Sequence, residues 1–269
     1  RFHDGFRLLL PQTDNDSKAD GSQSKPPTSS SSISNGALPG VFSVSATQKV
    51  HFAQGNLQYQ ASTNTWRFAE NQWDMIGDDN SDISSSNSGW IDLFGWGTGD
   101  DPIKSSEIDD DYSNFTDWGV EMSGNWHTLM TDEWKFVFDA RSTSNGIRYA
   151  KAIVNGVNGM ILLPDNWNNS YYSLSKTNDR GADFSSNYIT QSDWKTHLES
   201  NGAVFLPAAG GRYGTSVRSV GDLGRYWSAS YIGSYDASNM FFNDTNFYGA
   251  NGNSKYLGGS VRLVTPAEN

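Results

Sequence analysis

Alternating apolar and polar side chains over residues 224–264 predict β-strands near the C-terminus. In the run 237–243, Met240 and Phe242 fall on one face of a strand, and Asn239, Phe241 and Asn243 fall on the other. The pattern predicts that one set of apolar side chains points inward as a scaffold: Trp227, Met240, Phe242, Val261 and Leu263.

The segment between these apolar anchors consists mostly of Ser, Asn, Tyr, Gly and Asp. Tyr provides a large contact area at little entropic cost, and Ser, Asn and Gly provide adaptable hydrogen bonds, as in antibody binding loops. Because the same small polar residues also form turns, ordinary connections between strands are the alternative interpretation. The alternation favours an outward-facing ligand surface, and we predict these ligand-binding residues: Tyr231, Ile232, Ser234, Tyr235, Asp236, Ser238, Asn239, Phe241, Asn243, Asn246, Phe247, Tyr248, Asn251, Asn253 and Tyr256.

Two helices are predicted in the middle of the chain. The first spans 131–141, with Thr131 as its N-cap, two acidic residues in its first turn, and an apolar face of Trp134, Val137 and Phe138. The second begins with a cap at Thr190 and is closed by Gly202. Strands are predicted within 41–69, at 159–164 and at 203–207, so the fold class is α+β with many short, mostly antiparallel strands.

The N-terminal part of the chain divides into two segments. Residues 1–11 form a short strand-like run, and residues 12–40 form a flexible linker rich in Ser, Pro and Gly. The motif at 6–11 is similar to that at 261–266, so residues 1–11 are either the tail strand of an upstream repeat or a coincidental match. Residues 41–269 are predicted to form one ligand-binding domain, and a chain that starts at Arg1 is expected to be a fragment or a processed form.

A long Gly- and Asp-rich segment, 77–125, carries Trp90, Trp96 and Trp118. Structureless loops of this length are rare in compact domains, so these tryptophans are expected to pin an irregular but ordered loop onto the core. The acidic runs 78–82 and 109–111 are interpreted as solvated loops, with a structural calcium as the alternative.

Composition restricts the classes of function. The net charge is −11 and the pI is about 4.7, which argues against a nucleic-acid partner because no basic patch is available to neutralise phosphates. The chain has no cysteine, so disulfides, thiolate metal sites and cysteine nucleophiles are excluded. No apolar stretch approaches the roughly 18 residues of a membrane span.

Catalytic chemistry is not predicted. His3, His51, His127 and His197 are far apart in the sequence and lack metal-ligand spacing, and His127 is expected to make a local hydrogen bond. Ser228 does not lie in a G-x-S-x-G motif. We therefore expect no enzymatic activity and no cofactor apart from the alternative calcium.

Five phrases occur in this order along the chain: GNWHTLMTDEWKFVF, NGMILLPDNW, GAVFLPAAGGRYG, YWSAS and GGSVRLV. Together they resemble the C-type-lectin-like domains related to the formylglycine-generating-enzyme fold, including a group of paralogous surface proteins of gut anaerobes. Formylglycine-generating enzymes use a cysteine pair, so the resemblance does not carry that activity to this cysteine-free chain. Calcium-dependent lectins use Glu-Pro-Asn or Gln-Pro-Asp with Trp-Asn-Asp, and the absence of these triplets argues against a calcium-bridged sugar site.

Proteins of this fold include the variable proteins of diversity-generating retroelements. In those proteins adenine-directed mutagenesis rewrites a C-terminal segment, and Asn codons change mainly toward Ser, Asp, Tyr, Gly, Thr, Ala and Ile, the set that dominates 230–256 here. The resemblance implies a non-enzymatic receptor-recognition protein with a diversified C-terminal binding face, located outside the cell, on the cell surface or on a phage particle. Its partner is expected to be a protein or glycan on another cell or surface. The alternative is a fixed surface adhesin or carbohydrate-binding module, with Trp90, Trp96 and Trp118 as an aromatic platform for sugars.

Overall fold

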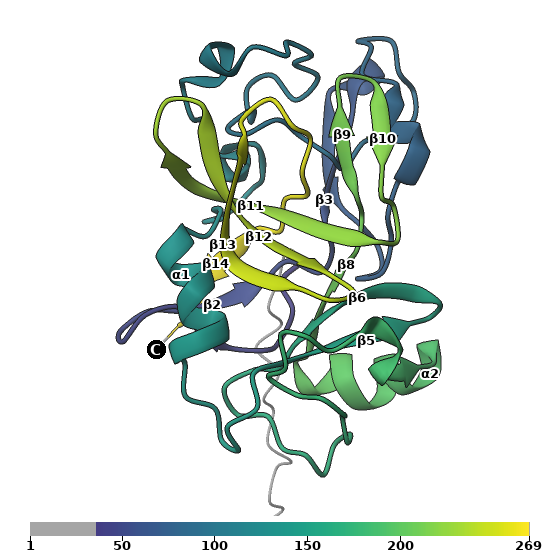
Figure 1. Cartoon of the computed structure of the whole chain (residues 1–269), viewed down its shortest axis with the longest axis vertical. Helices are drawn as coiled ribbons and strands as arrows, with labels where there is room; N and C mark the ends of the chain where they lie inside the picture. The colour runs from purple at the N-terminus through teal and green to yellow at the C-terminus, as the bar shows by residue number, and fades with distance from the viewer. Residues whose placement is uncertain (1–35, 269) are drawn as a thin grey trace, which may run out of the picture. The chain divides into compact units, whose positions relative to one another are not determined.

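The computed structural model describes residues 36–268, which lie within one compact unit (Figure 1). The predictions for 1–11 and for the linker up to residue 35 lie outside the described residues. The predicted boundary between linker and domain at residue 41 is wrong. Ala37 forms a β-bridge with Ala53, and the Leu38 side chain is buried in the core, so residues 36–40 belong to the folded domain.

The strands form several small sheets. The largest has the order β7-β5-β6-β8, from β5 (Tyr149–Val154), β6 (Val157–Leu162), β7 (Tyr188–Ile189) and β8 (Val204–Pro207). A three-stranded sheet, called here the C-terminal sheet, consists of β11 (Leu223–Ile232), β12 (Asp236–Asn243) and β13 (Phe247–Ser254). A second three-stranded sheet consists of β1 (Phe42–Ser43), β2 (Lys49–Phe52) and β14 (Val264–Pro266). Two strand pairs complete the set: β3 (Leu57–Gln60) pairs with β4 (Thr65–Phe68), and β9 (Gly211–Tyr213) pairs with β10 (Ser216–Arg218).

Two α-helices occur among residues 36–268, and both continue into wider π-helical turns. Helix α1 (Thr131–Lys135) continues through Phe136–Ala140, and α2 (Gln191–Asp193) continues through Trp194–Leu198. The predicted cap of α2 is confirmed, because Thr190 Oγ1 accepts a hydrogen bond from Asp193 N at 3.1 Å. Its predicted end is confirmed by Gly202, whose φ of +89° only glycine adopts readily.

The predicted cap of the first helix is one residue late. Met130 occupies the N-cap position, and its backbone N–H donates to the Glu133 carboxylate at 2.7 Å. Neighbouring strands of the described sheets pair antiparallel except β5 with β7. The predicted α+β class is confirmed.

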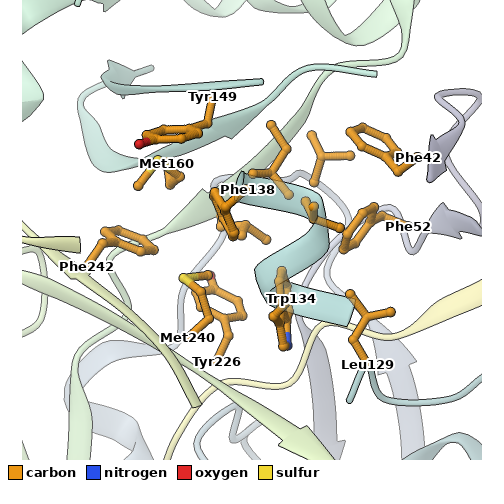
Figure 2. Packing of buried hydrophobic residues seen from close by; sticks show 14 of the residues in the cluster. Phe42, Phe52, Leu129, Trp134, Phe138, Tyr149, Met160, Tyr226, Met240 and Phe242 are labelled. Atoms are coloured by element: carbon orange, nitrogen blue, oxygen red, sulfur yellow. The ribbon is translucent and has the colours of Figure 1, made fainter. Parts of the chain in front are cut away.

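One face of the C-terminal sheet packs on the first helix. Figure 2 shows Trp134 and Phe138 of this helix beside Tyr226, Met240 and Phe242 of the sheet. The Trp134 and Phe138 rings stack with centroids 6.2 Å apart. Met240 and Phe242 are fully buried, which confirms the inward orientation predicted for them. Trp134 is also fully buried, which confirms the apolar face predicted for the first helix.

The opposite face of the C-terminal sheet is covered by a second cluster. Trp227 packs there with Trp96, Trp118, Val261 and Leu263, and all five side chains are buried. Trp96 Nε1 donates to Ser228 O at 2.9 Å, and Trp227 Nε1 donates to Phe94 O at 2.7 Å. Both faces of the sheet are covered along much of its length. Successive side chains of a strand therefore point into two different hydrophobic cores there, instead of one into the core and the next into solvent.

Trp96 and Trp118 pin the long segment 77–125 to this second core, as predicted. The alternative aromatic platform of Trp90, Trp96 and Trp118 is wrong, because Trp96 and Trp118 are only 2% and 0% exposed. Trp90 is partly exposed, but the Arg67 guanidinium lies 3.6 Å from its ring centroid.

Candidate ligand-binding surface

The connection between β11 and β12 presents large apolar side chains to solvent. Tyr231, Ile232 and Tyr235 are 68%, 50% and 62% exposed, although they are residue types that usually lie inside a domain. Ser234 between them is exposed, and Asp236 is partly buried. Gly233 has a φ of +74°, which lets the chain reverse within a short turn. These residues, 231–236, are called the hairpin end.

Lys255 stabilises the conformation of the hairpin end. Its ammonium donates to Ser234 O at 2.9 Å and lies 5.2 Å and 5.7 Å from the ring centroids of Trp96 and Tyr231. Its backbone N–H donates to Tyr235 O at 3.2 Å. Since the Lys255 side chain is itself buried, these contacts hold the turn in one conformation. Sequence patterns did not identify this residue, because a lysine in a polar segment is usually solvated.

Met130 is a second residue that the sequence analysis missed. It is 48% exposed, and Ser230 Oγ lies 4.0 Å from its sulfur atom. Ser230 Oγ also accepts a hydrogen bond from Thr131 N, which attaches the start of α1 to the end of β11. Met130 is 100 residues before Ser230 in the chain, so only the fold brings the two near each other.

Farther along the sheet, Phe241 and Tyr248 form a stacked pair. Their ring centroids are 6.1 Å apart with an interplanar angle of 29°, and Tyr248 is 48% exposed. Asn251 and Asn253 follow on the same strand and are partly exposed. The Asn253 Nδ2 atom is buried without a hydrogen-bond partner.

Three of the predicted contact residues are buried, which contradicts the exposure expected of them. Phe247 is 2% exposed because it pairs with Phe242 across the sheet and so shares its core-facing side. Asn239 is fully buried because it pairs with Trp227 under the second core, and its Nδ2 donates to Asn251 O at 3.1 Å. Ser238 is 1% exposed, and its carbonyl accepts a hydrogen bond from Ser228 Oγ.

Asn243 and Asn246 lie at the other end of β12 from the hairpin end. Eight residues of strand place the two ends of β12 about 20 Å apart. Asn243 Oδ1 accepts from Thr245 N and Asn246 N at 3.0 Å and 2.8 Å, so it shapes the β12–β13 turn. Tyr256 is partly exposed and packs against the second core. The structure thus brings together the hairpin end and the adjoining part of β13, and it separates the Asn243 turn from them.

The candidate catalytic and metal-binding residues show only local contacts. His127 Nδ1 lies 3.4 Å from Asn125 O, and His51 Nδ1 lies 2.9 Å from Gly40 O. In the acidic run 78–82, the Asp82 carboxylate accepts from Ser84, which holds the pKa of Asp82 below its usual value. Within residues 36–268, no three His, Asp or Glu side chains are grouped so that they can hold a metal ion. The calcium considered for the long loop gains no support from this geometry.

The hairpin end therefore offers aromatic and aliphatic contact area together with hydroxyl and backbone amide groups. Its turn is held in one conformation by Lys255. No helix in the described part of the chain combines the length and apolar character needed to cross a membrane. In comparisons with known proteins, no family model, no curated protein and no solved structure matches the chain.

Proposed function

We propose that the protein is a non-enzymatic ligand-binding protein and that its receptor-recognition surface is the hairpin end with the adjoining part of β13. The observation that carries the proposal is the exposure of Tyr231, Ile232 and Tyr235 on a turn that Lys255 holds in place. Tyrosines dominate binding energy at protein interfaces when they are rigid and surrounded by polar groups. A preorganised turn also loses little entropy on binding.

We further propose that this surface is diversified, as in the retroelement variable proteins that the sequence resembles. Support comes from the separation between scaffold and surface. The five predicted scaffold side chains are all buried, whereas the hairpin end and Tyr248 are exposed or partly exposed. Substitutions at exposed positions usually change stability by only about 0.5 kcal/mol, so this surface tolerates rewriting. The nucleotide sequence tests this proposal: a nearby repeat that differs from the coding segment only at adenines, beside a reverse-transcriptase gene, is expected.

The same resemblance leads us to propose a C-type-lectin-like fold and a location outside the cell, on its surface or on a phage particle. A protein ligand is preferred over a glycan at the hairpin end, because the exposed apolar side chain of Ile232 accompanies the tyrosines there. Contiguous exposed apolar area of this kind marks protein interaction sites.

Matched tyrosine substitutions test the binding surface. The variant Tyr231→Ser/Tyr235→Ser removes two exposed rings from the proposed surface. The control variant Tyr171→Ser/Tyr188→Ser removes two exposed rings elsewhere, with exposures of 39% and 70%. Each chain is measured against an immobilised panel of bacterial surface proteins and glycans, and by thermal denaturation.

We expect the control to bind the same panel member as the wild type. The surface variant is expected to bind at least about 30-fold more weakly, because hot-spot residues contribute about 2 kcal/mol or more each. Both variants are expected to remain folded, since surface substitutions have small effects on stability. Equal affinity of the surface variant and the wild type for that panel member would contradict the proposal.

A further inference from the structure

A hollow of about 450 Å³ lies away from the residues of the hairpin end. Its wall is formed by β4, which contributes Trp66 and Phe68, and by the segment 121–126, which contributes Glu121 and Trp126. Gln54, Gly36, Arg67, Met122 and Ser123 complete the lining. Hollows of this volume that combine aromatic walls with a few polar groups are typical of small-molecule sites.

The aromatic wall is held rigidly by other rings. Trp66 packs against Tyr59 and Phe94, with ring centroids 4.6 Å and 5.6 Å away, yet it remains partly exposed. Phe68 meets Trp126 edge to face at 4.7 Å. The chain passes closely over Phe68 at Gly36, where a Cβ atom would lie 2.9 Å from the Phe68 ring. Each ring is therefore fixed before any ligand arrives.

The polar groups of the hollow include the Glu121 carboxylate, which has no cationic partner among residues 36–268. Arg67 also lines the hollow, but its Nε donates to Gln58 Oε1 at 2.8 Å and its guanidinium lies over Trp90. Burial raises the pKa of Tyr59, and the negative charge of Glu121 raises it further. Gln54 Nε2 donates to Ala69 O, which leaves its Oε1 atom available as an acceptor.

We propose that this hollow binds a neutral hexopyranose at the end of a glycan. One face of a pyranose ring presents C–H groups, which pack against aromatic rings such as Trp66, while its rim presents hydroxyl groups that donate hydrogen bonds. Glu121 and Gln54 Oε1 accept those hydrogen bonds, and a charged acceptor makes them stronger than neutral ones. The same negative charge, on a chain of net charge −11, disfavours sialic acids and uronic acids.

This glycan site is independent of the proposed protein-binding surface, because the two share no residue. It also differs from the platform expected from the sequence, since Trp96 and Trp118 are buried and Trp90 is covered by Arg67. A molecule with both sites holds a neutral glycan at one place while the hairpin end contacts a protein.

Binding of defined glycosides to the full chain tests the proposal. The probes are methyl β-galactoside, methyl β-glucoside and methyl α-mannoside, with the methyl glycoside of N-acetylneuraminic acid as the anionic control, followed by saturation-transfer NMR and calorimetry. The variants are Trp66→Ala, Trp66→Phe and Glu121→Gln. Glu70→Gln is the matched control because Glu70 is also an exposed carboxylate but does not line the hollow.

We expect at least one neutral glycoside to bind and the anionic glycoside not to bind. Trp66→Ala is expected to weaken binding at least about tenfold, and Trp66→Phe by no more than about threefold because it keeps an aromatic face. Glu121→Gln is expected to weaken binding about tenfold through loss of a charged acceptor, with Glu70→Gln unchanged. Glu121 is exposed, so its variant reports on binding even if Trp66→Ala does not fold.

Three results would each overturn the proposal. These are absence of binding by all three neutral glycosides, preference for the anionic glycoside, and equal affinity of Glu121→Gln and wild type. Loss of glycoside binding in the Tyr231→Ser/Tyr235→Ser variant would assign it to the hairpin end and also overturn the proposal. Failure of the hairpin-end proposal leaves these expectations unchanged, because its variants alter other residues.

Discussion

Phe247 and Tyr248 are adjacent on β13, yet the pairing of the C-terminal sheet gives them opposite environments. Phe247 is 2% exposed and lies 4.4 Å and 5.4 Å, between ring centroids, from Phe138 and Tyr149. The Arg180 guanidinium lies 5.0 Å from the Phe247 ring. Tyr248 is 48% exposed. We therefore expect Phe247→Ala and Tyr248→Ala to differ sharply in their effect on stability.

The difference can be worked from burial. Phe247→Ala removes a buried ring and leaves a cavity among aromatic neighbours, which typically lowers the free energy of unfolding by about 3 to 5 kcal/mol. For a domain of this size, that corresponds to a fall in Tm of about 6 to 20 °C. Tyr248→Ala removes one stacked contact on the surface, and we expect a loss of about 0.5 to 1 kcal/mol, or roughly 1 to 4 °C.

Urea denaturation and differential scanning calorimetry of the two variants measure both quantities. Equal destabilisation by the two substitutions would refute the reasoning, and a larger effect of Tyr248→Ala would show that β13 is shifted by one residue, since such a slip exchanges the two faces of a strand.

Two further predictions concern buried groups. Burial raises the pKa of Asp92 from 3.8 to about 6 in the folded state, despite its hydrogen bond from Asn80. The folded state then holds a proton that the unfolded state has released, so the free energy of unfolding falls by about 3 kcal/mol in total as pH rises from below the unfolded pKa to above the folded pKa of about 6. Relative to Asp92→Asn, the wild type should lose this stability as pH rises, and parallel pH profiles of the two proteins would contradict the prediction. Gly224→Ala should cost about 1 to 3 kcal/mol in thermal denaturation because a Cβ atom there would lie 2.2 Å from Phe242, whereas Gly252→Ala, with neighbours no nearer than 3.5 Å, should be close to neutral.

Local sequence signals predicted both helices and the two ends of the second helix. The Thr190 cap and the Gly202 end of the second helix depend on a side chain and a φ angle within a few residues, so the sequence alone predicts them. The inward orientation of Met240 and Phe242 follows from the two-residue period of a strand. Large aromatic residues in a long segment likewise predicted buried pins, which the structure shows at Trp96 and Trp118.

Tertiary structure alone decided which residues on those strands meet solvent. Alternation assigns two sides to a strand, but it does not tell whether a second layer covers the outer side, and here Trp227 and its cluster cover Asn239. In the sequence, Phe247 lies in a segment of polar and aromatic residues that predicts an exposed position. In the structure, its pairing with Phe242 places it in the core. A periodic pattern predicts which side chains share one face of a strand, whereas burial depends on all the elements packed against that face.

The sites of contact also depend on residues distant in the sequence. Lys255 and Trp96 support Tyr231 from elsewhere in the chain, and Met130, just before α1, contacts Ser230 near the end of β11. The glycan hollow joins Trp66 to the segment 121–126 in the same way. Local patterns report the preferences of neighbouring residues, and such long-range contacts form only when the hydrophobic cores bring separate segments together.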